Sequence, residues 1–291
     1  MAQTFAAFGS AVTVIDAGPH VLPREDTDAA EIVARRMRAD GVRLVHGATI
    51  TRAERRGAEA VVHYTVGGKA ETVPCDAILV GVGRAPNVDG LGLETAGIAY
   101  DREGVTVDDF LRTTNPRVYA AGDIASRYKF THTADASARI VLANALFPGR
   151  KRASTLHVPW CTYTTPEVAH VGLSADEARA RRIEVDTLTI PLRDVDRARL
   201  DGEEEGFLRV HVRKRNDRIV GATLVAAHAG DIISEITVAM VGGLGLGTIA
   251  NVVHPYPTQA EVVKKAADAW NRGRLTPTVR RVLGWWLRFR R

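Results

Sequence analysis

The chain has 291 residues, 45% of them hydrophobic and 25% charged, a composition typical of a globular protein with two or three domains. No apolar run approaches the roughly 20 residues of a membrane-spanning helix, and no signal peptide is visible. The net charge of +5 comes from residues 271–291, which hold seven arginines and no acid, so the remainder is slightly acidic and no nucleic-acid partner is expected.

The first predicted elements, in residues 1–83, alternate between helix and strand. A helix ends at Phe8 before Gly9, and a second helix begins at Asp26 or Thr27 and ends before Gly41. The pattern predicts strands over 11–15 and 42–47, a hairpin with a Gly-Gly turn over 61–73, and a buried strand over 77–83. This arrangement indicates a parallel α/β layer with an antiparallel insert.

Residues 84–153 are richer in loops. The sequence predicts short strands over 104–109 and 117–124, followed by a helix over 132–147. We place domain boundaries near residues 83 and 153.

Residues 154–291 have the pattern of an α+β domain. Strands are expected over 158–164, 167–172, 186–192, 207–213 and 219–226, and helices over 174–181, 231–243, 246–253 and 260–270. An antiparallel sheet with helices packed on one face fits this order.

Two acidic residues stand where nucleotide sites place them. Asp16 ends a predicted strand, where a carboxylate can bind both hydroxyls of an adenine ribose. No arginine follows in AGPHVLP to bind a 2′-phosphate, which favours NADH over NADPH. Gly122 and Asp123 end another predicted strand, where glycine permits close approach and the acid can bind a sugar hydroxyl. The alternatives are a solvated loop acid for the first and an Asx-capped turn for the second.

Three motifs in chain order carry a resemblance to a known family: GVGRAPN, TTNPRVYAAGDI and HPYPTQAE. Together they resemble the pyridine nucleotide-disulfide oxidoreductases, flavoenzymes that include dihydrolipoamide dehydrogenase and mercuric reductase. The resemblance implies a homodimer in which electrons pass from NAD(P)H to FAD and then to an acceptor. The expected fold class is α/β plus α+β. An incomplete Rossmann-like region, with a partial NAD(P)-binding domain (1–83) and part of an FAD-binding domain (84–153), precedes an α+β dimerisation domain (154–291).

The resemblance implies a role for each matching residue. Asp16 corresponds to the acid at the adenine ribose, and Gly81 and Gly83 to glycines beside the nicotinamide half of the cofactor. Asp123, after Gly122, corresponds to the carboxylate that holds the FAD ribityl chain. Thr133 and Ala134 lie at the beginning of the next helix. There the family places backbone N–H groups against the flavin ring, and the helix dipole favours negative charge on that ring.

The family's two glycine-rich loops and its CxxxxC disulfide lie before the point where this sequence begins. We therefore expect the chain to be the C-terminal part of a longer enzyme, and the alternative is a non-catalytic dimerising fragment. Cys75 and Cys161 are far apart, lie in strand-like apolar stretches and read as small core residues. They indicate a reducing compartment, and a cytoplasmic protein is expected.

HPYPTQAE departs from the disulfide-reducing members, which place a histidine directly before Pro-Thr. Here Tyr256 takes that position, with Glu261 in place and His254 two residues earlier. Tyrosine is a poor base at neutral pH. A tyrosine at this position resembles mercuric reductase instead. These three are the candidate catalytic residues. The acceptor is expected to be small, and its identity stays open between a disulfide, a metal ion and other acceptors. No resident metal is expected. The alternative is a Pro-rich loop that caps the helix from Ala260.

The tail, residues 277–291, predicts an amphipathic helix. Val279, Val282, Leu283, Trp285, Trp286, Leu287 and Phe289 share one face, and Arg280, Arg281, Arg288 and Arg291 share the other, while Arg290 interrupts the apolar side. Tryptophan beside arginine suits an anionic lipid surface. The hypothesis is a peripheral contact with the inner membrane face, and the alternative is a tail packed on its own dimer or a disordered end.

Overall fold

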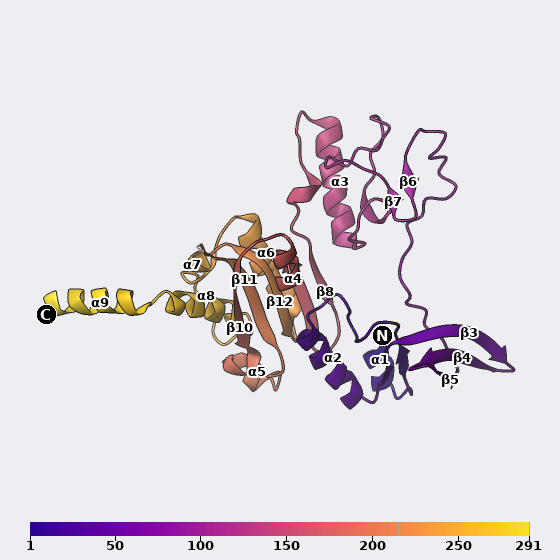
Figure 1. Cartoon of the computed structure of the whole chain (residues 1–291), viewed down its shortest axis with the longest axis horizontal. Coiled ribbons are helices and arrows are strands. Elements are labelled where there is room, and N and C mark those ends of the chain that lie inside the picture. Colours follow the sequence, from indigo (N-terminus) through magenta and orange to yellow (C-terminus); the bar gives the residue numbers. More distant parts are fainter. Residues whose placement is uncertain (215, 291) are drawn as a thin grey trace. The chain divides into compact units, whose positions relative to one another are not determined.

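The computed structural model describes residues 1–214 and 216–290, and its elements are labelled in Figure 1. The chain divides into two compact units. The first unit joins Met1–Ile78 with Pro159–Arg291, and the second unit is Leu79–Val158. The predicted fold class, α/β plus α+β, is confirmed, while the three-domain assignment stays a prediction.

The N-terminal segment of the first unit contains a two-stranded parallel sheet. Its elements are α1 (Ala2–Ala7), β1 (Thr13–Ile15), α2 (Thr27–Ala39) and β2 (Arg43–Val45), with β1 paired to β2. Gly9 and Gly41 follow the two helices with φ of +92° and +86°, a conformation that glycine adopts without strain. Both helix ends therefore match the sequence analysis.

Three antiparallel strands follow: β3 (Ala48–Arg56), β4 (Glu59–Val66) and β5 (Lys69–Cys75). The predicted hairpin is present, and Gly67 and Gly68 form its turn with φ of +56° and +77°. Strand β3 was not predicted. Only its first residue is buried, so its sequence lacks the alternation of a half-buried strand.

The predicted buried strand over 77–83 is wrong. These residues form no strand, and Leu79, Val80 and Val82 are 70–82% exposed. A parallel strand is buried only when neighbouring strands and helices flank it. Among the described residues no strand pairs with this segment, so its apolar composition does not produce a strand.

The C-terminal segment of the first unit is built on a five-stranded antiparallel sheet of order β10-β11-β12-β9-β8. The strands are β8 (Pro159–Thr162), β9 (Glu167–Gly172), β10 (Val185–Pro191), β11 (Phe207–Arg213) and β12 (Ile219–Ala226). Each of them matches a predicted strand.

The helices of this segment supply the main core together with the sheet. They are α4 (Ala175–Ala180), α5 (Asp196–Leu200), α6 (Ala229–Val241), α7 (Leu246–Ile249), α8 (Glu261–Gly273) and α9 (Pro277–Phe289). Leu208 and Leu224 of the sheet, Ile236 of α6 and Val262 of α8 are fully buried in this core, to which α9 contributes nothing. The strand residues in this core lie on the face of the sheet that these helices cover.

Helix α2 packs on the opposite face of the same sheet. Ala30 and Val33 share a second core with Val168, Phe207 and Val225. The expectation of helices on one face is therefore incomplete, because a helix from the N-terminal segment buries the other face.

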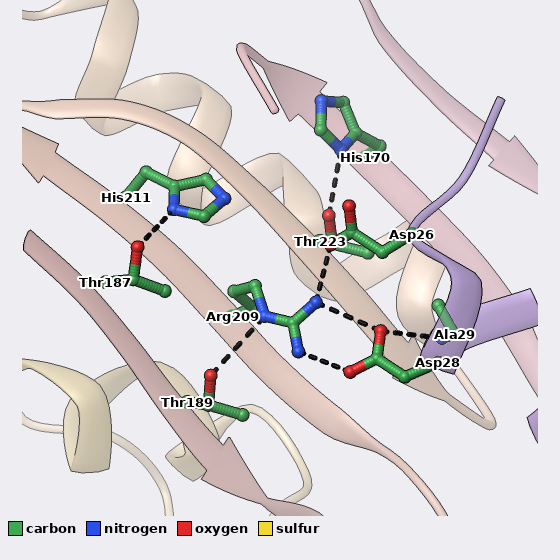
Figure 2. A network of polar contacts seen from close by, with 9 residues as sticks. All are labelled: Asp26, Asp28, Ala29, His170, Thr187, Thr189, Arg209, His211 and Thr223. Atoms are coloured by element: carbon green, nitrogen blue, oxygen red, sulfur yellow. Dashed lines mark hydrogen bonds and ion pairs between the residues drawn. The ribbon is translucent and has the colours of Figure 1, made fainter. Parts of the chain in front are cut away.

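A polar network holds that contact (Figure 2). The Arg209 guanidinium donates to Asp26 Oδ2 at 2.6 Å and to both carboxylate oxygens of Asp28, at 3.1 and 2.5 Å. The same side chain lies 3.4 Å from Thr189 Oγ1. Because the Arg209 side chain is only 18% exposed, these bonds satisfy a charge that is largely removed from water.

The second unit is small and loop-rich. It contains β6 (Tyr100–Asp101), β7 (Gly104–Val105) and α3 (Thr131–Leu146), and Leu93, Ile98 and Val105 form a small core in it. The strand predicted over 104–109 is thus reduced to two residues. The strand predicted over 117–124 is wrong, because only Tyr119 makes an isolated bridge, to Arg112, before a 3-10 turn over Gly122–Ile124.

Candidate functional site

Two of the motifs meet inside the second unit. Arg84 of GVGRAPN places its Nη1 atom 4.0 Å from Asp123 Oδ2 of the AAGDI stretch. The same Arg84 nitrogen donates to the Lys129 carbonyl at 2.7 Å. Arg84 therefore ties the acid to the loop that leads into α3.

Gly122 determines where Asp123 lies. Its φ is +80°, and a Cβ placed there would lie 3.3 Å from the Ala134 Cβ. The Gly122 N–H donates to Ser137 Oγ at 3.0 Å, and that hydroxyl donates to the Ala134 carbonyl at 2.9 Å. Glycine thus lets the turn approach α3 closely, and Asp123 stands beside the first turn of that helix.

The first turn of α3 holds the two residues predicted to face the flavin ring, Thr133 and Ala134. Thr133 is 4% exposed, and its Oγ1 is buried without a hydrogen-bond partner among the described residues. The Ala134 N–H donates to the Phe130 carbonyl at 3.0 Å. This bond belongs to α3, which begins at Thr131, and the assignment of Thr133 and Ala134 to the flavin ring stays a prediction.

Gly81 and Gly83 lie in the exposed segment of the second unit that precedes Arg84. Gly83 has φ of +119°, and nothing lies within 4 Å of a Cβ at either position. The backbone there is open to a ligand.

Asp16 lies in the first unit, at the carboxyl end of β1. Its Oδ1 accepts the Gly18 N–H at 2.6 Å, and its backbone forms hydrogen bonds with Val45 of β2 and with Ala48 of β3. The carboxylate caps its own loop with one oxygen, as a loop acid would, and the described residues supply no donor to the second oxygen. A loop cap and a ribose-binding acid are both compatible with this geometry.

The three candidate catalytic residues do not form one hydrogen-bonded chain. His254 Nε2 lies 2.9 Å from Glu235 Oε1 of α6. The Tyr256 hydroxyl donates to Asp196 Oδ2 of α5 at 3.0 Å. Glu261 has one buried carboxylate oxygen, Oε2, without a partner among the described residues, and its Oε1 lies 3.5 Å from Lys265 Nζ.

The contact with Asp196 raises the pKa of the Tyr256 phenol, to which the charge of Glu261 adds. The phenol therefore keeps its proton at neutral pH and acts there as a hydrogen-bond donor rather than as a base. Tyr256 is 71% exposed, so this proton is accessible from solvent.

The surroundings of Cys161 are unfavourable for a nucleophile. Cys75 and Cys161 are half-buried in β5 and β8, so the expectation of core residues is only partly right. Burial, with the nearby carboxylate of Glu167, raises the pKa of Cys161 to about 12, and a protonated thiol is unreactive. Within residues 1–214 and 216–290, no group of three or more metal-binding side chains is placed to hold an ion.

Comparison with known proteins agrees with the motifs. Residues 1–138 match the family described as pyridine nucleotide-disulphide oxidoreductase, and residues 158–267 match the dimerisation domain of that family. The chain belongs to the pyridine nucleotide-disulphide oxidoreductase family. The resemblance inferred from GVGRAPN, TTNPRVYAAGDI and HPYPTQAE is therefore confirmed.

Relatives within this family include mercuric reductase of Bacillus cereus, 33% identical over 91% of this chain and 42% of that protein. Dihydrolipoyl dehydrogenase of Geobacillus stearothermophilus is 31% identical over 92% of this chain and 57% of its own length. The chain spans about half the length of the curated relatives it matches.

Solved structures show the same similarity. The HOCl-induced flavoprotein disulfide reductase RclA from Escherichia coli matches with a TM-score of 0.82 and 29% identity, over 92% of this chain and 61% of that one. LpdA from Mycobacterium tuberculosis matches with a TM-score of 0.86 and 30% identity, over 92% and 58%.

Four partners of the candidate residues were missed by the sequence analysis. They are Arg84 beside Asp123, Ser137 on Gly122, Asp196 on Tyr256 and Glu235 on His254. Arg84 lies inside GVGRAPN, so that motif is a usable signal. The others lie 15, 60 and 19 residues from the groups they contact, and no local pattern points to them.

Proposed function

We propose that this chain is the part of a flavin-dependent oxidoreductase that binds the ribityl side of FAD and forms the dimer. In this proposal electrons pass from NAD(P)H through FAD to a small acceptor. The observation that carries it is the Gly122–Asp123 turn, which Ser137 holds against the first turn of α3. The family membership and the flavoprotein among the solved relatives support the same assignment.

The residues present fit FAD. Asp123 would accept a hydrogen bond from a ribityl hydroxyl, and the N-terminus of α3 would favour negative charge on the reduced ring. The buried Thr133 Oγ1 is a polar atom that lacks a partner among the described residues and belongs to the same turn of the helix. When bound, FAD supplies the capacity to accept a hydride from the nicotinamide and to pass two electrons onward.

For the nicotinamide cofactor we favour NADH. The second oxygen of Asp16 is available to accept from ribose hydroxyls, whereas a 2′-phosphate would meet a negative charge there. Gly81 and Gly83 would leave room for the nicotinamide half.

The acceptor side is assigned to Tyr256. Its phenol, which the contact with Asp196 keeps protonated with a smaller contribution from Glu261, would exchange its hydrogen bond to Asp196 for one to the acceptor. His254 is bound to Glu235 and has the role of a positioning residue. The acceptor is a small molecule, left open between a disulfide, a metal ion and another small oxidant. A protonated phenol would donate to a disulfide sulfur or to a ligand of the metal ion, and not to the cation itself.

A homodimer through residues 154–291 completes the proposal. The dimerisation-domain match covers residues 158–267. Val238 and Val241 of α6 are 67% and 69% exposed, and Val252 and Val253 follow α7 with 45% and 92% exposure. An exposed apolar surface of this kind is typical of a subunit interface.

The test is FAD binding by the full chain, which is measured by the fluorescence and the absorbance of the flavin. Asp123→Ala should weaken binding about tenfold or more, because a hydrogen bond to a charged group contributes about 1.5–3 kcal/mol. Asp135→Ala is the matched control, since this acid also belongs to the α3 region but is 63% exposed and pairs with Arg139. Equal FAD affinity for both variants, or no FAD binding by the parent chain, would contradict the proposal.

A further inference from the structure

Helix α9 contributes no buried residue to the first unit. It begins with a cap in which Thr276 Oγ1 accepts the Val279 N–H at 3.3 Å, and Pro277 occupies its first turn. These are ordinary signals of a helix start. The helix therefore has local reasons to form, but the chain itself does not cover its side chains.

The side chains of α9 separate into two faces, as the sequence analysis predicted. At about 100° per residue, one broad face carries apolar side chains that are 39–75% exposed: Val279, Val282, Leu283, Trp285, Trp286, Leu287 and Phe289. The opposite face carries Arg280, Arg281, Gly284 and Arg288. Arg291, assigned to this face from the sequence, lies outside the described residues.

Arg290 lies on the apolar face of α9, but its charge packs against an aromatic ring of that face. Its guanidinium lies 4.6 Å from the ring centre of Trp286, so the charge stacks on the indole. Trp285 and Phe289 also contact each other, with ring centres 4.8 Å apart. The apolar face thus includes an aromatic surface near the C-terminal end of the chain, on the helix labelled α9 in Figure 1.

The charge on this helix points to an anionic partner. After Asp268 the sequence contains no acidic residue. No ion pair among residues 1–214 and 216–290 involves Arg280, Arg281 or Arg288. A second copy of α9 would bring like charges together, which disfavours pairing of two such helices.

The length of α9 distinguishes a helix that lies on a membrane from one that crosses it. Thirteen residues extend about 20 Å at 1.5 Å per residue, whereas the hydrocarbon core is about 30 Å thick. No helix in the described part of the chain is long and apolar enough to span a bilayer. An amphipathic helix with aromatic side chains on one face and arginine on the other instead lies in the headgroup region.

We propose that α9 binds the surface of an anionic lipid bilayer. Its apolar face, centred on Leu283 and Trp286, enters the boundary between headgroups and acyl chains. Arg280, Arg281 and Arg288 then remain at the level of the lipid phosphates. This contact would place the protein on a membrane independently of which acceptor the enzyme reduces.

The test is flotation of the full chain with vesicles of phosphatidylcholine, with and without phosphatidylglycerol. The chain should float only with vesicles that contain phosphatidylglycerol. Arg280→Gln with Arg288→Gln should weaken binding roughly 30-fold, since each basic residue near an anionic surface contributes about 1 kcal/mol.

A matched pair of neutral substitutions tests the apolar face. Leu283→Gln with Trp286→Gln should abolish flotation, because the lipid-facing area is lost while the charge is unchanged. Gly284→Gln introduces the same side chain on the arginine face and should float like the parent chain.

Three outcomes would overturn the proposal. The parent chain could float equally with both kinds of vesicle, or it could fail to float. Gly284→Gln could also lose as much flotation as Leu283→Gln with Trp286→Gln. If the parent chain does not float and Leu283→Gln with Trp286→Gln changes its oligomeric state in solution, the face binds a second copy instead.

Discussion

Arg209 is one of the residues that join the N-terminal and C-terminal segments of the first unit. Its guanidinium lies between Asp26 and Asp28, about 180 residues earlier in the chain (Figure 2). The same contact lowers the pKa of Asp28, with the hydrogen bond from Arg209 as its largest cause. The network therefore contributes to the packing of α2 on the sheet, as well as to local charge balance.

Arg209→Ala should lower the free energy of unfolding by about 1–3 kcal/mol, because it removes hydrogen bonds to two carboxylates, one of them mostly buried. Arg213→Ala is the control: this arginine is exposed at the end of the same strand, and its loss should cost less than about 0.5 kcal/mol. Urea unfolding of both variants is the measurement, and equal costs would contradict this role for Arg209.

Two buried histidines of the same sheet predict a pH dependence. His170 bonds to Thr223 and His211 bonds to Thr187, and they are 4% and 1% exposed. Burial lowers the pKa of both imidazoles below the usual 6.5. The folded state therefore holds them neutral at pH values where the unfolded chain takes up protons.

The free energy of unfolding should be constant above about pH 7.5 and fall as the pH drops through about 6.5 and below. The urea midpoint measured between about pH 5 and 8 tests this. His211→Gln cannot take up a proton, so its stability should fall less steeply with acid. A parent chain that is as stable at the lower pH as at the higher one would exclude the effect.

At the scale of elements, the contact between β9 and β12 is decided by small residues. Gly221 pairs with Gly172, and a Cβ at Gly221 would overlap the Leu173 carbonyl oxygen. The backbones of β9 and β12 therefore lie so close together at Gly221 that a Cβ atom would not fit between them. Helix α6 packs over these same two strands, so a shift between them would disturb the main core.

Gly221→Ala should destabilise the chain by about 2–3 kcal/mol, the usual cost of forcing an extra group into a packed region. Gly273→Ala is the opposite case, since nothing lies within 4 Å of a Cβ at the end of α8. It should be neutral or stabilising by up to about 1 kcal/mol, because alanine favours helix. Thermal unfolding distinguishes the two, and a Gly221→Ala chain as stable as the parent would show that the strands can separate freely.

For the whole molecule, the exposed face of α6 and the segment after α7 predict how copies associate. Val238→Glu with Val241→Glu should raise the dissociation constant of the proposed dimer on the order of 100-fold, because charge would enter a desolvated interface. Ile50→Glu, at a 48% exposed position on β3, is the control. Sedimentation at several concentrations is the measurement, and a dimer that withstands the α6 substitutions would place the interface elsewhere.

Local patterns in the sequence determined much of the fold. The five strands of the C-terminal sheet were predicted because each is a short apolar run bounded by turn residues. The helix over Thr27–Ala39 was predicted from its capping residue and the glycine that follows it, and the helix over Glu261–Gly273 was predicted over 260–270. The three motifs were sufficient for the family, since residue order in a motif does not depend on what lies beside it in space.

Tertiary structure decided the rest. The apolar segment 77–83 is no strand because strand formation depends on neighbours that a local pattern does not contain. Helix α2 lies on the second face of the sheet because its apolar side packs on Val168, Phe207 and Val225, and Asp26 and Asp28 bind Arg209 at the same contact. Tyr256 is held by Asp196, 60 residues away, rather than by nearby Glu261. These features depend on contacts between distant residues, whose energies arise only when the chain has folded.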